Sequence, residues 1–270
     1  MICYARPNLQ LTWGISADVW KTGKGFLPQS VTPSSYGLNF PTTGANKFWF
    51  YLAIGGISQA LSWAPVSHGG ITATMTDSTS TSVKVTLTGP VATYSQWASE
   101  NPSRIASLSL PQVFELVGRD RRGNAIIKYG FKLKQWFVNR GPVTGTLGFK
   151  YASLSSWCNK IGGYRVPKVS DLTNASCQGD FSGPQCQGAV GATPSSPVNR
   201  CKRHIGGGFL SEWGDPYYYN KDEYSYYGRF WTNDKYELRN NHNFGVLSPE
   251  CQVTVYDLDV PEVRGVCVYP

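Results

Sequence analysis

The sequence lacks long apolar runs, catalytic motifs and paired metal-binding cysteines. No stretch approaches the roughly 20 consecutive apolar residues of a membrane-spanning helix, although 41% of the residues are hydrophobic. The only histidines are His68, His204 and His242, and no HExxH, GxSxG or Walker sequence occurs. No two cysteines form a CxxC pair. We therefore expect a protein that is not an enzyme and that uses no cofactor, no metal ion and no membrane-spanning segment.

Cysteine is almost absent before residue 157, where only Cys3 occurs. Clustered cysteines without metal-ligand spacing favour disulfides, and disulfides persist in the periplasm, at the cell surface or outside the cell. The spacing does not choose among the several connectivities that six cysteines allow. The six cysteines after residue 157 are Cys158, Cys177, Cys186, Cys201, Cys251 and Cys267.

Acidic residues are also scarce in the first half of the chain. Residues 1–150 carry 14 Lys and Arg against 5 Asp and Glu, whereas residues 151–270 carry 11 against 12. An exported protein seldom reads nucleic acid, so we expect no nucleic-acid partner and interpret the basic cluster as a solvated hairpin whose lysines protect a sheet edge. Its members are Arg119, Arg121, Arg122, Lys128, Lys132 and Lys134.

Short alternating segments dominate residues 1–145. With 29 Gly, 17 Pro and 14% aromatic residues, the composition favours short strands joined by turns. Segments 71–75 and 82–87 form the clearest hairpin candidate. At least seven short strands with regular turns predict an immunoglobulin-like (Ig-like) β-sandwich. The segment 47–57, the most apolar of this half, is predicted as a central pair of strands, and the other predicted strands cover 9–20, 71–75, 82–87, 113–119, 125–134 and 136–138.

The stretch 157–172, WCNKIGGYRVPKVSDL, begins a different pattern. Gly162 and Gly163 should end a helix, because glycine readily adopts the left-handed C-cap conformation. A short strand over 164–166 and a second helix over 169–172 follow. The first helix is predicted over 152–160, where four residues share one face: Leu154, Trp157, Cys158 and Ile161.

The second half reads as a separate α+β domain over 146–270, joined to the first by a linker over 139–146. The loop 176–197 is long for a compact domain and must be tied down, which its two cysteines, Cys177 and Cys186, make feasible. Segments 251–255 and 263–268 are expected as closing strands.

Tyrosine is concentrated between residues 213 and 231. Rigid amphipathic rings mixed with small polar groups are typical of recognition loops, although half of these rings could instead form core. We predict a receptor-binding surface made of Trp213, Asp215, Tyr217, Tyr218, Tyr219, Asp222, Tyr224, Tyr226, Tyr227 and Trp231.

Several short motifs resemble the C-terminal adhesion module of intimin/invasin-family bacterial adhesins and their secreted relatives. In that family an Ig-like domain precedes a C-type-lectin-like domain, so the resemblance implies this order over 1–145 and 146–270. The motifs are Cys158-x-x-x-Gly162-Gly163, Tyr164-Arg165-Val166-Pro167, Glu212-Trp213-Gly214, Phe230-Trp231-Thr232 and Gly265-Val266-Cys267-Val268.

The resemblance also implies a function and a disulfide pattern. The protein would be a secreted or surface-exposed bacterial adhesin or effector that binds a protein receptor through its lectin-like tip. Cys158 would pair with Cys267, and the other four cysteines are most simply paired as Cys177 with Cys186 and Cys201 with Cys251. We expect the chain to act as a monomer.

Two alternatives keep the same fold. A calcium-dependent lectin that binds a glycan would use Asp215, Asn233 and Asp234, although this chain has Gly214-Asp215-Pro216 where sugar-binding lectins have Glu-Pro-Asn or Gln-Pro-Asp. A secreted passenger would instead dock to its own bacterial outer-membrane partner.

Overall fold

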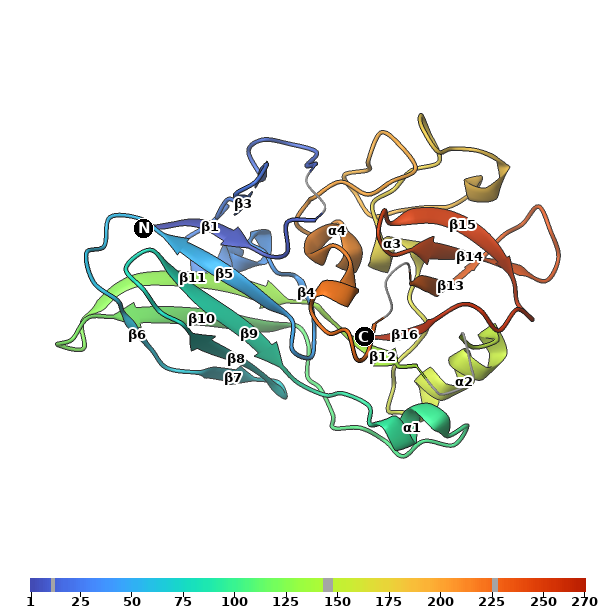
Figure 1. Ribbon diagram of the computed structural model, residues 1–270, viewed down its shortest axis with the longest axis horizontal. Helices are drawn as coiled ribbons and strands as arrows, with labels where there is room; N and C mark the ends of the chain where they lie inside the picture. Colours follow the sequence, from blue (N-terminus) through green and yellow to red (C-terminus); the bar gives the residue numbers. More distant parts are fainter. Residues whose placement is uncertain (11–12, 143–147, 225–227) are drawn as a thin grey trace.

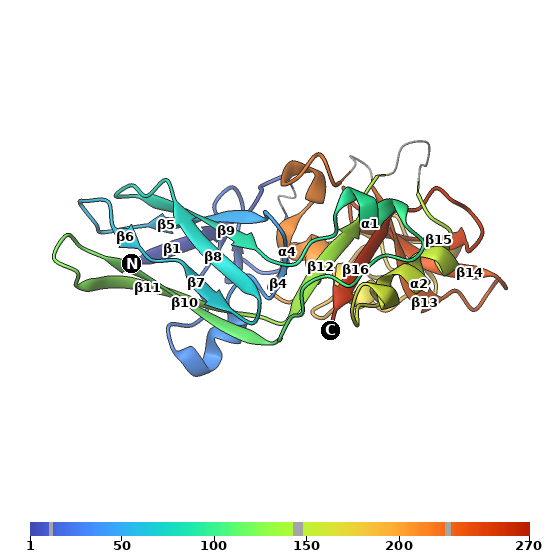
Figure 2. The same cartoon turned by 90° about the horizontal axis from the view of Figure 1, so that it is seen from below.

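The computed structural model describes residues 1–10, 13–142, 148–224 and 228–270. The molecule is elongated (Figures 1 and 2), with a β-sandwich at one end and a mixed assembly of short helices and strands at the other. Both termini lie on the body of the molecule, the N-terminus on the sandwich and the C-terminus near the junction of the two halves.

The larger layer of the sandwich is a seven-stranded sheet in the order β2-β3-β1-β5-β9-β8-β7. All its neighbouring strands are antiparallel, and the predicted hairpin over 71–87 is confirmed as β8 and β9. The strands are β1 (Ile2–Arg6), β2 (Trp20–Lys21), β3 (Gly25–Phe26), β5 (Trp49–Ile54), β7 (Val66–His68), β8 (Ile71–Thr76) and β9 (Ser82–Thr88).

The second layer has the order β11-β10-β6, with β6 (Ser62–Trp63), β10 (Gln112–Arg119) and β11 (Ala125–Leu133). Its inner face meets the first sheet through aromatic side chains: the ring of Phe50 lies 6.0 Å from that of Phe131 and 6.4 Å from that of Tyr129. Two antiparallel sheets packed on one aromatic core confirm the predicted Ig-like sandwich.

Two predictions for this half are wrong. In the described part of 9–20 no strand forms before β2, because the backbone there bonds to the second half: the Arg203 amide donates to Trp13 O (2.7 Å) and the Ile15 amide to Arg203 O (3.3 Å). The segment 47–57 yields the single strand β5, because the chain turns at Gly55 and Gly56, the latter with φ +72°.

Two further sheets lie outside the sandwich. One is antiparallel, in the order β13-β14-β15; in the other, β12 pairs antiparallel with β16 and parallel with β4. The predicted linker over 139–146 is wrong for its first two residues, because Asn139 and Arg140 are the last residues of β12. The strands are β4 (Thr43–Ala45), β12 (Gln135–Arg140), β13 (Arg229–Lys235), β14 (His242–Leu247), β15 (Gln252–Asp257) and β16 (Gly265–Tyr269).

The helices are short. The predicted first helix is confirmed as α2 (Tyr151–Lys160), which ends at Gly162 and Gly163 with φ +129° and +86°. The strand expected over 164–166 is reduced to one bridge between Arg165 and Val268, because Pro167 has no N–H to extend it. The others are α1 (Tyr94–Ala98), α3 (Val169–Leu172), α4 (Phe209–Trp213), η1 (Pro33–Leu38), η2 (Pro184–Cys186) and η3 (Pro216–Tyr218).

All three expected disulfides form. Cys158 on α2 bonds to Cys267 on β16 and closes a sequence separation of 109 residues. Cys177–Cys186 ties the long loop, and Cys201–Cys251 joins a second loop to the start of β15. Cys3 is a free cysteine.

Segments on both sides of the predicted boundary at 145/146 interlock. Strand β12, before the boundary, pairs with β16, after it, and the Trp157 indole on α2 donates to Gln96 O on α1 (2.8 Å). The division into 1–145 and 146–270 therefore stays a prediction, and the two halves share elements at their junction.

Candidate functional site

The aromatic segment predicted to bind a receptor begins inside the protein. Trp213 and Trp231 have no exposed surface, and Asp215 and Tyr224 are each 4% exposed. A partner cannot reach these four side chains in this structure. The prediction that they contact a receptor is therefore corrected: they form the support of the surface.

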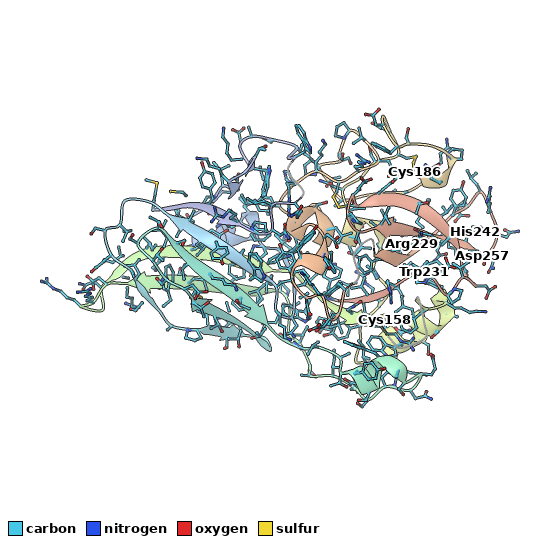
Figure 3. All side chains as sticks on the ribbon, viewed as in Figure 1. Cys158, Cys186, Arg229, Trp231, His242 and Asp257 are labelled. Atoms are coloured by element: carbon cyan, nitrogen blue, oxygen red, sulfur yellow. A yellow bond between two sulfur atoms is a disulfide. The ribbon has the colours of Figure 1, made fainter. Side chains whose placement is uncertain are left out.

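Both tryptophans use their indole N–H within the protein. The Trp213 indole donates to Thr43 O on β4 (3.0 Å), and its ring lies 4.8 Å from that of Phe40. The Trp231 indole donates to Phe149 O (2.7 Å). Figure 3 shows Trp231 inside the second half, with His242 and Asp257 farther out toward its end. A buried Trp whose N–H is paired is typical of core.

Two charged side chains lie beneath the segment without any exposure, Glu212 and Arg203. Burial raises the pKa of Glu212 and lowers that of Arg203 to about 10. The Arg203 guanidinium donates to the carbonyls of Glu212 and Asn8, and lies 4.9 Å from the Trp20 ring. These bonds fix α4 against the first half of the chain.

Tyr219 connects the two halves directly. Its hydroxyl donates to Trp213 O (2.8 Å) and accepts the Asn8 amide (2.8 Å). Its ring stacks on Phe48 at 4.3 Å and lies 5.3 Å from that of Trp49. Burial raises the pKa of its hydroxyl. Tyr219 is thus an anchor with one partly exposed edge.

The remaining predicted contact residues stay near the surface. Tyr217 and Tyr218 are half-buried on η3 with ring centroids 5.5 Å apart, and Asp222 is exposed. Asp215 Oδ1 accepts the Tyr217 amide (3.2 Å), which fixes the start of η3, and Lys221 Nζ lies 5.5 Å from the Tyr217 ring. Tyr226 and Tyr227 lie outside the described residues.

The residues of the calcium alternative do not share one site. Asp215 Oδ1 accepts the hydroxyl of Ser248 near the start of β13, whereas Asp234, near the end of β13, caps α3 through the Val169 amide (2.6 Å). Six strand residues span about 20 Å, so Asp215 and Asp234 are too far apart to hold one cation. Asn233 accepts the Tyr151 hydroxyl (2.8 Å).

Across the described ranges, no three His, Cys, Asp or Glu side chains gather as a metal site. In the same ranges, none of the helices has the length and apolar character required to cross a membrane.

Trp13 and Phe181 are exposed aromatic residues outside the predicted receptor-binding segment. Trp13 is 66% exposed, with Lys202 Nζ 5.5 Å from its ring, and Phe181 is 46% exposed, with Arg200 Cζ 3.4 Å from its ring. They border one groove of about 410 Å³. The sequence predicts Trp13 in a strand and Phe181 in the disulfide-tied loop, and the one local sign of an exposed contact is a large aromatic residue beside polar neighbours.

Comparison with known proteins identifies the fold but no sequence relative. No protein-family model and no curated protein matches the sequence. A crystal structure of invasin, described as a bacterial integrin-binding protein, matches 97% of this chain with a TM-score of 0.54 and 15% identity. The fold is intimin/invasin-like. The chain spans 39% of the invasin structure's length.

Two intimin structures also match this intimin/invasin-like module, at TM-scores too low to add to the argument. One is a C-terminal 282-residue fragment of intimin in complex with the intimin-binding domain of the translocated intimin receptor, Tir (TM-score 0.47, 11% identity, 98% of this chain, 66% of that one). The other is an intimin–Tir90 complex (0.46, 13%, 100% of both chains).

Proposed function

We propose that the chain is the receptor-binding end of a secreted or surface-exposed bacterial adhesin, and that it binds a protein on a host cell without catalysing a reaction. The contact surface is the η3 region, made of Tyr217, Tyr218 and Asp222 with the exposed edge of Tyr219. The invasin-like fold supports this function, since invasin is described as integrin-binding.

One observation carries the proposal: two tyrosine rings are presented on a rigid base. Asp215 fixes one end of η3 and Tyr219 fixes the other through its bonds to Trp213 and Asn8. Tyrosine loses little conformational entropy on binding, and a preorganised base lowers the cost further. Asp222 and Lys221 add polar contacts at the rim.

The test is binding of the fluorescently labelled chain to host cells, followed by flow cytometry. We expect the double variant Tyr217→Ser/Tyr218→Ser to bind at least about 30-fold more weakly, as for loss of a hot spot of about 2 kcal/mol. Its thermal unfolding should stay close to wild type. Tyr94→Ser, on α1, removes a tyrosine that is 54% exposed and is the matched control.

Equal binding by wild type and the double variant would contradict the contact surface. Capture from bacterial outer membranes but not from host-cell lysate, abolished by the same double variant, would instead support the secreted passenger that docks to its own surface partner. Binding that EDTA abolishes would contradict the proposal, because the η3 surface uses no metal ion.

A further inference from the structure

The outer face of the seven-stranded sheet carries aromatic rings and cations together. Successive strand residues point to opposite faces, and on the inner face Ala5, Phe50 and Val83 are fully buried. Figure 1 shows β1, β5 and β9 side by side in the sandwich. The aromatic–cation face is defined here as the outward residues of these strands with one loop lysine: Tyr4, Arg6, Trp49, Tyr51, Lys84 and Lys24.

The strand register sets the spacing of these groups. Tyr51 is paired with Arg6 on one side and with Lys84 on the other, so one row across three strands reads cation, ring, cation. Cation–π attraction operates within about 6 Å of a ring centroid. Each ring has a cation at that distance: Lys24 at 6.0 Å from Tyr4, Arg6 at 5.8 Å from Tyr51 and Lys84 at 5.3 Å from Trp49.

Carboxylates are missing from this sheet. None of its seven strands contains Asp or Glu, and the only acidic residues before position 100 are Asp18, ahead of β2, and Asp77, in the turn after β8. Within the described residues, no carboxylate forms an ion pair with Arg6, Lys24 or Lys84. Cations that are not neutralised add up to a local positive potential that attracts anions.

Hydroxyl groups extend the same face. Thr74 on β8 is paired with Thr86 on β9, and Thr72 with Thr88. Each hydroxyl can donate and accept a hydrogen bond. A sheet face is extended and shallow, so it fits an elongated ligand with many hydroxyls better than a compact one. The face continues to Tyr219, whose ring lies 5.3 Å from that of Trp49.

We propose that the aromatic–cation face binds an acidic, sulfated polysaccharide. The cations would pair with sulfate groups, as they do with other oxyanions; the flat rings would lie against sugar rings, and the threonine rows would bond sugar hydroxyls. The three disulfides indicate an oxidising compartment, where such polymers are available. This site uses other side chains than the protein-receptor surface, apart from the shared border at Tyr219.

The experiment measures the affinity of the full chain for immobilised heparin fragments at physiological salt. The triple variant Arg6→Gln/Lys24→Gln/Lys84→Gln should bind at least about tenfold more weakly, a loss that corresponds to about 1.4 kcal/mol. The matched control Arg121→Gln/Arg122→Gln/Lys134→Gln removes three cations elsewhere on the same half and should change the affinity less than about twofold. Tyr51→Leu keeps the charge and should weaken binding several-fold. Thermal unfolding verifies that each variant folds.

Three results would overturn the proposal. An equal loss in both triple variants would show that only net charge matters. Wild-type binding to uncharged dextran as tight as to heparin would remove the role of the cations. Equally tight binding of single-stranded DNA with the same number of charges, lost in the same triple variant, would make this a general polyanion surface.

Discussion

Glu212 on α4 accepts both the backbone N–H and the hydroxyl of Thr43 on β4, at 2.9 and 2.6 Å. The same carboxylate accepts the amide and hydroxyl of Thr42 and the amide of Gly206. Every partner is a donor, so one buried side chain satisfies groups from both halves of the molecule. This contact positions α4, and with it the start of the η3 surface.

Glu212→Gln should destabilise the protein by about 2–3 kcal/mol. Both carboxylate oxygens face N–H donors, so either orientation of the amide places its NH₂ against another donor and leaves that donor unsatisfied. Denaturant unfolding measures the loss. Glu237→Gln makes the same chemical change at an exposed position and should alter the stability by about 0.5 kcal/mol or less. A Glu212→Gln variant as stable as this control would contradict the role of the carboxylate.

Removing the Cys158–Cys267 disulfide should cost more than removing Cys177–Cys186. The chain-entropy model gives about 4.7 kcal/mol for a loop of about 100 residues and about 2.6 kcal/mol for one of about 9, and the two bonds close separations of 109 and 9 residues. Paired Cys→Ala variants compared by denaturant unfolding test this order. The opposite order would mean that the short loop contributes native packing beyond its closure entropy.

Tyr224→Ser and Tyr218→Ser should separate core from surface within one segment. Tyr224 is 4% exposed and packs between Phe48 and Phe230, with ring centroids at 5.9 and 6.5 Å. Its truncation should cost about 3–5 kcal/mol. Tyr218 is half-buried at the surface, and its truncation should cost about 0.5 kcal/mol. Thermal unfolding of both variants decides whether the assignment is correct.

The sequence predicted local structure well where one short pattern controls it. The apolar face of α2 and the glycines that follow it are local signals, and the β8–β9 and β10–β11 hairpins alternate clearly. The segment around Trp13 failed because its backbone partner, Arg203, lies about 190 residues away in the sequence. No local pattern contains such a partner.

The receptor-binding prediction failed in part for a similar reason. Tyr224 and Tyr218 look alike in the sequence, and their different burial is set by Phe48 and by the anchors around η3. In the sequence Glu212 appears only within the motif Glu212-Trp213-Gly214. Its buried role has no local pattern, because its five donors come from Thr42, Thr43 and Gly206, which lie in other segments.

The stability of the sandwich should fall as the pH rises from 10 to 12. Burial, with the hydrogen bond to Glu115, raises the pKa of Tyr36 to about 12, above its ordinary value of 10.0. The folded state therefore holds this proton where the unfolded state releases it, so the stabilisation is complete below pH 10 and is lost as the pH rises toward 12. Tyr36→Phe should lower the stability at pH 7 by about 1 kcal/mol but flatten the decline above pH 10.

Tyr36→Phe should also change the titration of Glu115 at low pH, because the Tyr36 hydroxyl donates a hydrogen bond to that carboxylate. The bonds from Tyr36 and Lys128 hold the pKa of Glu115 below its ordinary value, so their contribution is present above that value and is lost as the pH falls through it. In Tyr36→Phe the pKa of Glu115 should move back up, which an NMR titration of the Glu115 side-chain carboxyl measures. Tyr94→Phe removes an exposed hydroxyl and should leave that titration unchanged. A Glu115 titration identical in wild type and Tyr36→Phe would mean that Lys128 alone stabilises the carboxylate.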